Sequence, residues 1–258
     1  ARFSDVNWGD ESVALVTEVL RTKQRYKVSV YNAKAGSLTT LFERSLTDAY
    51  SNIGNSVTIK NKFGKSVIAT LNNGRSVLMN NTTGASEKGD LPFLSIYNLD
   101  TKTNEIIWRS KEDCFEYVAD VLDVASLKII TRRETEKEVP NYFLKSLKAN
   151  TSVAITNFAN PYASMEGVTK QKIKYKRADG VDLTGDLYLP KGYNKEKDGP
   201  LPVLIWAYPR EFNSAADAAQ VRGSKDRFTT LSWASPIYYA TQGYAILDNA
   251  EMPIVSTD

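Results

Sequence analysis

The side chains that could act as nucleophiles in this sequence lack the base that usually activates them, because the 258 residues include no histidine. A serine or cysteine nucleophile commonly passes its proton to an imidazole, and zinc sites commonly use imidazole ligands. The composition therefore excludes a Ser-His-Asp or Cys-His arrangement within these residues. Any hydrolytic function must obtain its base from outside them.

The thiol and hydroxyl groups themselves offer no clear nucleophile. Cys114 is the single cysteine, which excludes an intrachain disulfide and a cysteine-based metal cluster. Its aromatic and apolar neighbours predict a buried strand thiol rather than a reactive one. No serine lies in the Gly-x-Ser-x-Gly elbow of serine hydrolases. We therefore expect no nucleophile among four serines in ordinary loop or helix-start sequence: Ser214, Ser224, Ser232 and Ser235.

Charge and hydrophobicity exclude further classes of protein. With 33 basic and 30 acidic residues, the net charge of +3 is too balanced to predict a nucleic-acid or anionic-membrane partner. No stretch approaches the roughly 18 consecutive apolar residues of a membrane span. The sequence also has no phosphate-binding glycine loop, and we expect no metal and no cofactor. Its start does not resemble a signal peptide, so the compartment stays open, with export favoured for a bacterial protein.

The first part of the chain, residues 1–165, is predicted to form short β-strands separated by polar turns. Three similar units of strand, turn and strand occur at residues 26–42, 93–108 and 141–155. An Asn-Gly pair at residues 73–74 favours a tight hairpin between strands at 66–71 and 76–79. Repeats of roughly 40 to 50 residues indicate propeller blades, and the longer first interval must hold an insertion. About three would fit, whereas a closed propeller needs about four to eight, so we expect a partial propeller.

The second part, residues 166–258, has an α/β pattern. A hairpin is predicted at residues 171–189, buried strands at 203–206 and 243–247, and helical segments at 215–221 and 236–241. The continuous apolar run at 203–206 is typical of a strand buried on both faces. The predicted fold class is therefore mixed, with a partial all-β propeller followed by the N-terminal portion of an α/β domain.

Several segments of the second part resemble a known family. Residues 177–190 (RADGVDLTGDLYLP) and 201–212 (LPVLIWAYPREF) resemble the start, the third strand and the following loop of the α/β-hydrolase domain in prolyl-oligopeptidase (S9) family serine peptidases. Residues 220–224, 243–248 and 252–255 are similar to the glutamyl endopeptidase branch, known from plant chloroplasts and bacteria. The match covers about residues 171–255, and the propeller part is compatible with it.

This resemblance implies a peptidase that hydrolyses peptides, after Glu or other acidic residues, beneath a capping propeller. In the family, the nucleophile elbow, the acid and the histidine all follow the segment that matches residues 252–253. We therefore expect residues 166–258 to stop before the nucleophile, and this fragment to be inactive by itself. The alternative is a non-catalytic propeller-type module that binds peptides or proteins.

Tyr208 is the residue whose role the resemblance implies most directly. In many family members, a tyrosine in this loop donates its hydroxyl to the oxyanion that forms when serine attacks the peptide carbonyl. The sequence here departs from the commoner Tyr-Gly-Gly, since Pro209 and Arg210 follow the tyrosine. Proline removes a backbone N–H, which leaves the shape of the loop open. The alternative is a tyrosine that packs under the propeller.

A preference for glutamate implies a cationic pocket, for which Arg210 and Arg222 are the candidates. The planar guanidinium binds carboxylates through two hydrogen bonds at once. Each arginine could instead pair with Glu211 or Asp217 in a purely structural role.

The resemblance also has a consequence for association. In an α/β-hydrolase sheet, the strand at residues 203–206 pairs with the strand that leads to the nucleophile elbow. Without that neighbour, the apolar edge has unpaired backbone groups, which favours association. We expect the chain to bind a second copy of itself or the remainder of its own enzyme.

Overall fold

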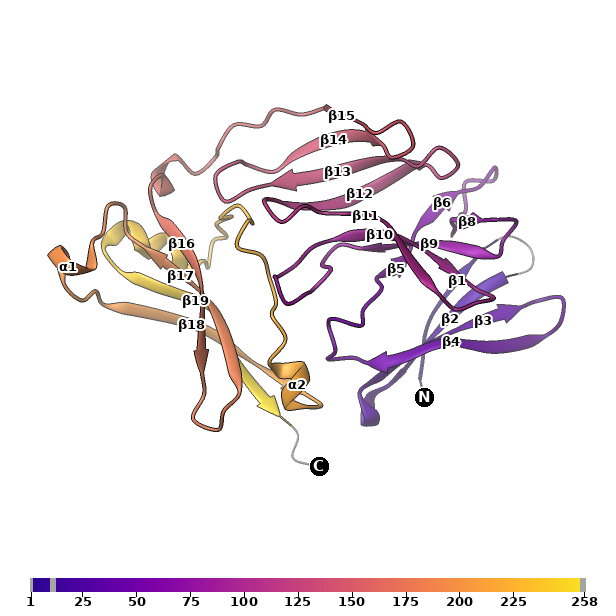
Figure 1. Cartoon of the computed structure of the whole chain (residues 1–258), viewed down its shortest axis with the longest axis horizontal. Coiled ribbons are helices and arrows are strands. Elements are labelled where there is room, and N and C mark those ends of the chain that lie inside the picture. Colours follow the sequence, from indigo (N-terminus) through magenta and orange to yellow (C-terminus); the bar gives the residue numbers. More distant parts are fainter. Residues whose placement is uncertain (1, 10–12, 256–258) are drawn as a thin grey trace.

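The computed structural model describes residues 2–9 and 13–255, and most of its regular structure is β-sheet. Three sheets formed by the first part of the chain lie next to one another in an arc, and a fourth sheet from the second part faces them (Figure 1). The only helices in the described ranges are short: η1 (Arg21–Lys23), η2 (Ala163–Met165), α1 (Lys195–Asp198), α2 (Ala215–Ala218) and η3 (Pro236–Gln242).

Each of the first three sheets is antiparallel, and in the first and third the neighbouring strands also follow one another along the chain. The first contains β1 (Arg2–Trp8), β2 (Val13–Leu20), β3 (Arg25–Asn32) and β4 (Ser37–Ser45). The second has β5 (Asn55–Ser56), β8 (Thr70–Leu71), β9 (Ser76–Asn81), β10 (Phe93–Asn98) and β11 (Asn104–Arg109). The third has β12 (Phe115–Asp123), β13 (Lys128–Glu134), β14 (Asn141–Ser146) and β15 (Thr151–Ala154).

The three repeated units of the sequence form the last two strands of these three sheets. β3 pairs with β4, β10 with β11 and β14 with β15, each antiparallel through a short turn. The prediction of strand, turn and strand is confirmed at all three places. Four-stranded meanders such as the first and third sheets are the building units of propellers.

The second sheet is buried on both faces, which joins the three sheets into one body. Along β9, Val77 and Met79 pack in a core with residues of the first sheet, such as Leu15. Leu78, which lies between them, packs in a second core with Ile129 of the third sheet. Successive side chains of a strand point to opposite faces, so one apolar strand contributes to both cores.

The predicted Asn-Gly hairpin is confirmed, but its first strand is shorter than expected. Leu71 pairs with Ser76 across the turn, and Asn72 and Asn73 adopt the positive φ angles of 52° and 57°. Residues 66–71 are divided, because β7 (Ser66–Ile68) pairs with β6 (Thr58–Lys60) in a separate small sheet.

The fourth sheet is mixed, and its strand order differs from the order in the chain. It runs β16 (Thr169–Lys176), β17 (Asp182–Leu189), β19 (Ala245–Val255) and β18 (Val203–Phe212). β16, β17 and β19 are antiparallel neighbours, whereas β18 runs parallel to β19. η3 packs on this sheet in a core that contains Met165, Tyr188, Ile237 and Ile246.

The burial predicted for residues 203–206 is wrong. Val203, Ile205 and Trp206 are each more than half exposed, because β18 is the outermost strand of the mixed sheet. The edge position itself agrees with the expected unpaired edge, and association of the chain stays a prediction. The predicted strand at 243–247 is buried as expected at Ala245 and Ile246.

Two local predictions for the second part also need correction. The helix expected at residues 215–221 is only one turn, α2, capped by the Ser214 side chain. The loop expected after residue 206 is a continuation of β18, where Tyr208 pairs with Glu251 and Pro209 with Met252. A proline is tolerated there because β18 is an edge strand.

In the described residues, no helix is long and apolar enough to cross a membrane.

We predict that Gly84→Ala destabilises the fold far more than Gly36→Ala. Both glycines have a φ of 61°, so alanine pays the same left-handed backbone cost at each. A Cβ at Gly84 would lie 2.0 Å from the Leu91 carbonyl oxygen, whereas a Cβ at Gly36 has no neighbour within 4 Å. Overpacking of this kind costs about 1–3 kcal/mol more. Urea denaturation of the two variants measures the difference, and equal losses would contradict the close approach.

Candidate functional site

A cavity of about 580 Å³ lies between the third sheet, the mixed sheet and the chain that joins β18 to η3. Its walls include six basic side chains and four carboxylates. These are Arg132, Lys170, Lys172, Arg210, Arg222 and Arg227, with Glu134, Asp186, Asp248 and Glu251. Tyr208 lies on the same wall as Arg210, since both belong to β18. The cavity therefore has a formal excess of positive charge.

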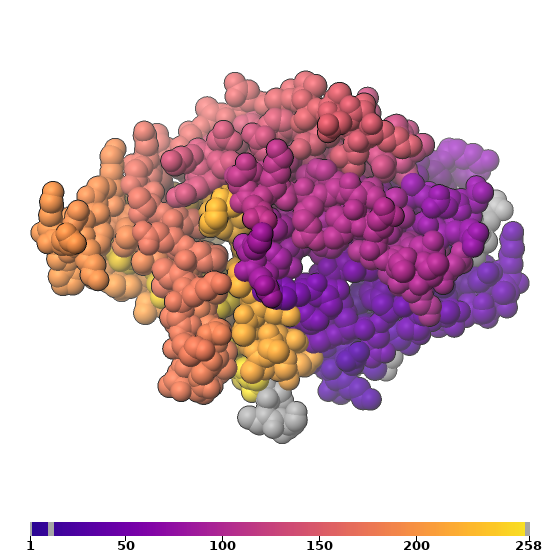
Figure 2. Space-filling view, viewed as in Figure 1, coloured from indigo at the N-terminus to yellow at the C-terminus, as the bar shows by residue number. Residues whose placement is uncertain are grey.

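One wall of the cavity is residues 213–227, here named the connecting segment. Its first half is hydrogen-bonded to the end of the first sheet. The Asp217 carboxylate accepts hydrogen bonds from the hydroxyls of Ser45 and Thr47, at 2.9 and 2.5 Å. The Gln220 amide accepts from the Ala49 backbone at 2.7 Å. Figure 2 shows orange atoms of this part of the chain against the indigo and magenta sheets.

The second half of the connecting segment contacts the second and third sheets. The Gly223 carbonyl accepts a hydrogen bond from the Asp90 backbone N–H at 2.9 Å. The Arg227 guanidinium lies 4.3 Å above the ring of Phe115 and 3.6 Å from the carboxylate of Glu134. Glu134 is almost fully buried and is also paired with Arg132 at 3.5 Å.

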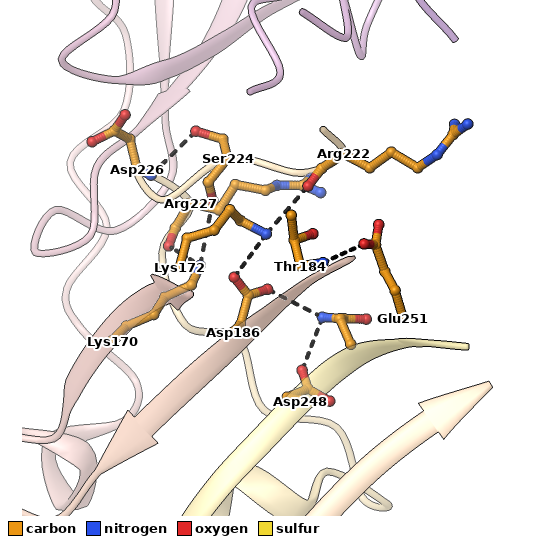
Figure 3. A network of polar contacts seen from close by, with 11 residues as sticks. Lys170, Lys172, Thr184, Asp186, Arg222, Ser224, Asp226, Arg227, Asp248 and Glu251 are labelled. Atoms are coloured by element: carbon orange, nitrogen blue, oxygen red, sulfur yellow. Dashed lines mark hydrogen bonds and ion pairs between the residues drawn. The ribbon is translucent and has the colours of Figure 1, made fainter. Parts of the chain in front are cut away.

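Two lysines of β16 hold the connecting segment from the other side, against the mixed sheet. Lys170 and Lys172 are alternate residues, so their side chains leave the same face of the strand. The Lys172 ammonium donates to the Arg222 carbonyl at 3.2 Å, and the Lys170 ammonium to the carbonyls of Ser224 and Arg227 at 3.4 and 3.5 Å. Figure 3 shows both lysines pointing toward this segment.

The carboxylates of the mixed sheet line the floor of the cavity. Asp186 forms an ion pair of 3.0 Å with Lys172 and accepts a hydrogen bond from Asn249 (Figure 3). Glu251 accepts a hydrogen bond from the backbone N–H of Thr184. Burial raises the pKa of Glu251 and of Asp248 above their ordinary values, because it disfavours the charged form. The floor is therefore a desolvated environment in which uncompensated charge is costly.

The structure places all three residues predicted from the sequence on this cavity. The Tyr208 side chain is 79% exposed, so it does not pack under the propeller sheets. Arg210 is also exposed, and no carboxylate lies within 4.0 Å of it among the described residues. Within the described residues, neither Arg210 nor Arg222 forms an ion pair with Glu211 or Asp217. These pairs were the structural alternatives to a role in substrate binding.

The guanidinium of Arg222 is already hydrogen-bonded within the protein. Its Nη2 donates to the Thr47 carbonyl at 2.8 Å and to the Asp217 carbonyl at 3.1 Å. Its guanidinium lies 5.2 Å from the centre of the Phe212 ring. Burial, followed by the charge of Arg210, lowers its pKa from the ordinary value.

Four residues of the cavity were not predicted from the sequence: Lys170, Lys172, Asp186 and Glu251. The alternation of lysines along β16 was a visible signal, but it indicated only a charged strand.

The cysteine and two of the serines considered from the sequence have structural roles. Cys114 is buried directly before β12, and burial raises the pKa of its thiol, as expected of an inert cysteine. Ser214 caps α2, and the Ser224 hydroxyl accepts from the Asp226 backbone.

Comparisons with known proteins identify relatives over nearly the whole chain. It is 37% identical over 267 residues to a probable glutamyl endopeptidase, chloroplastic, of Oryza sativa subsp. japonica, and 36% identical over 269 residues to one of Arabidopsis thaliana. Each match covers 98% of this chain and 28% of the relative, so the chain spans little more than a quarter of their length. No family model matches the sequence.

The fold is similar to that of a solved peptidase. The crystal structure of Porphyromonas gingivalis dipeptidyl peptidase 4 matches 96% of this chain and 39% of that chain, with a TM-score of 0.51 and 10% sequence identity. At this identity the similarity concerns the fold alone, and it agrees with the propeller-like sheets of the first part. Together with the two relatives, it confirms the resemblance that residues 171–255 carry.

We predict that Glu134→Gln destabilises the contact between the connecting segment and the third sheet. The neutral amide of glutamine removes the buried negative charge that Arg132 and Arg227 share, and this loss costs about 1–3 kcal/mol. Glu138→Gln is the matched control, because Glu138 pairs with Arg133 at the surface and contributes less than about 1 kcal/mol. Urea denaturation compares the two. Equal losses would show that Glu134 does not hold the segment.

Proposed function

We propose that the full-length protein containing this segment, which is related to the glutamyl endopeptidase branch of the prolyl-oligopeptidase (S9) family, is a serine peptidase that cleaves peptides after acidic residues. This chain would contribute a partial propeller, residues 1–165, and the N-terminal portion of the α/β-hydrolase domain, residues 166–258. The observation that carries the proposal is the identity of 36–37% across 98% of the chain with two probable glutamyl endopeptidases.

The arrangement of the mixed sheet supports the α/β-hydrolase part of this proposal. β18 is parallel to β19 and has no partner on its outer side within residues 2–9 and 13–255. Its apolar side chains Val203, Ile205 and Trp206 are exposed there, and Trp233 nearby is fully exposed. An exposed apolar edge is a place for a further strand. In the full-length protein, that strand would lead to the nucleophilic serine.

The reaction would follow the usual course of serine peptidases. The histidine takes the proton of the serine as the serine attacks the peptide carbonyl, and gives it to the leaving amine when the C–N bond breaks. Water then hydrolyses the acyl-enzyme. Both of these catalytic residues would come from outside this chain, which has no histidine. Tyr208 would contribute its hydroxyl to the oxyanion hole, where a hydrogen bond stabilises the negative charge of the tetrahedral intermediate.

The excess of positive charge in the cavity supports the preference for acidic residues. Arg210 and Arg222 are the ligands that the sequence suggests for the substrate carboxylate. Arg210 has its guanidinium available, whereas Arg222 has two of its hydrogen bonds directed to backbone carbonyls. We therefore expect Arg210 to contact the substrate and Arg222 to shape the wall of the cavity beside it.

The test of the proposed function is hydrolysis of a peptide by the full-length protein. We expect cleavage after glutamate and labelling of one serine by a fluorophosphonate probe. The absence of histidine from this chain favours, as a second candidate, a module that binds peptides without chemistry. Binding of the peptide without hydrolysis and without labelling would establish that candidate and reject the peptidase.

We predict that Tyr208→Phe in the full-length protein lowers kcat by about 100- to 1000-fold, the usual effect of removing one oxyanion donor. KM should change little, because the hydroxyl acts in the transition state. Tyr208 is 79% exposed, so the melting temperature should be unchanged. Tyr238→Phe is a suitable control, since it removes the hydroxyl of another exposed tyrosine outside the cavity. An unchanged kcat would reject the oxyanion role.

We predict that Arg210→Met reduces the preference for Glu over Gln at the cleaved position by about tenfold, through loss of a charge-assisted hydrogen bond. Arg222→Met should instead lower the melting temperature, because it leaves the Thr47 and Asp217 carbonyls without their donor. Ratios of kcat/KM for matched peptides measure the preference. If the ratio is unchanged in Arg210→Met, this arginine does not bind the substrate carboxylate.

A further inference from the structure

We propose that Lys170, which the sequence did not single out, is a specificity-determining residue of the cavity, and that its ammonium group binds the side-chain carboxylate of the acidic residue at the cleaved position. This inference rests on the proposed function. It names the cation on which the preference for Glu over Gln chiefly depends.

Three other cations of the cavity already have a carboxylate partner, whereas Arg222 donates to backbone carbonyls and Arg210 is exposed. Lys172 forms an ion pair of 3.0 Å with Asp186. Arg132 and Arg227 share the carboxylate of Glu134, at 3.5 and 3.6 Å. Each of these three cations faces a carboxylate before any ligand enters, although Arg132 and Arg227 share a single negative charge, so an additional carboxylate gains less from them.

Lys170 has no such compensation. Among residues 2–9 and 13–255, no carboxylate lies within 4.0 Å of its ammonium group, and its two hydrogen bonds to the carbonyls of Ser224 and Arg227 are long. The ring of Tyr188 lies 6.0 Å away. An ammonium has three donors, so one N–H has no acceptor in this part of the chain. A substrate carboxylate would supply both the acceptor and the missing negative charge.

Burial makes this lysine a stronger ligand than the exposed Arg210. An ion pair in a partly desolvated site is screened less than one at the surface. Burial also lowers the pKa of Lys170 from the ordinary value of 10.5, because desolvation disfavours the charged form. Binding of an anion would relieve that cost, whereas a neutral glutamine side chain would not.

The groups around Lys170 determine how its charge depends on pH. They are Asp186 and Tyr188 from β17, Lys172 from β16, Arg227 from the connecting segment, Glu136 from the turn after β13, and Asp248 from β19. Burial outweighs the attraction of Asp186, and the charges of Lys172 and Arg227 lower the pKa further. Lys170 is charged below its lowered pKa, so its contribution to specificity is lost as the pH rises through that value.

The pH dependence distinguishes a lysine from an arginine without any substitution. In the unmodified full-length protein, we expect the ratio of kcat/KM for a Glu peptide over its Gln counterpart to fall over the alkaline range below pH 10.5, the ordinary pKa of a lysine, because the pKa of Lys170 is lowered. Effects on the catalytic residues cancel in the ratio, because both peptides need them equally. A ratio that stays constant over this range would assign the preference to arginine and overturn the proposal.

Substitution provides the second measurement. Lys170→Met should reduce the Glu/Gln ratio by about 10- to 100-fold at pH 7.5, mainly by raising KM for the Glu peptide, with Gln cleavage retained. Lys174→Met is the matched control, since Lys174 is an exposed lysine of the same strand that does not line the cavity. If Lys170→Met does not fold, the pH dependence of the unmodified protein decides alone.

Failure of the inference and failure of the proposed function give different results. A protein that hydrolyses peptides and prefers Glu over Gln, but keeps this preference in Lys170→Met, contradicts only the role of Lys170. A protein that shows no hydrolysis, or no preference for Glu, contradicts the proposed function itself.

Discussion

Hydrogen bonds and an ion pair from the four large sheets converge on the connecting segment, residues 213–227. The first sheet reaches it through Ser45 and Thr47, the second through a short backbone contact at Asp90, and the third through Glu134. The mixed sheet reaches it through the lysines of β16. Little regular structure stabilises these residues, so their conformation depends on the contacts on both sides. The cavity exists because the two parts of the chain hold this segment between them.

The same contacts explain the electrostatics of the cavity. A partly buried lysine whose donors reach only backbone carbonyls has no carboxylate to compensate its positive charge, and this applies to Lys170. The neighbouring Lys172 uses one donor for a carbonyl and pairs with Asp186 as well. Two residues of the same type on one strand therefore have different capacities to bind an anion.

Much of the first part of the fold could be predicted from the sequence, because its information is local. The Asn-Gly turn at residues 73–74 and the three strand-turn-strand units depend on residues close together in the chain, and all four hairpins are present. The burial of residues 203–206 was predicted wrongly for the opposite reason. An apolar run reports what a strand could bury, whereas its position at the edge of the sheet depends on strand order.

The sequence by itself determined that no histidine is present, that three similar β-units precede an α/β pattern, and that Tyr208, Arg210 and Arg222 are the residues to consider. Only the tertiary structure decided which charges meet. In it, Arg222 donates a hydrogen bond to the Thr47 carbonyl, and Lys170 has no carboxylate partner among the described residues. The reason is that desolvation and ion pairing arise between segments as much as 175 positions apart, a relation that spacing along the chain does not encode.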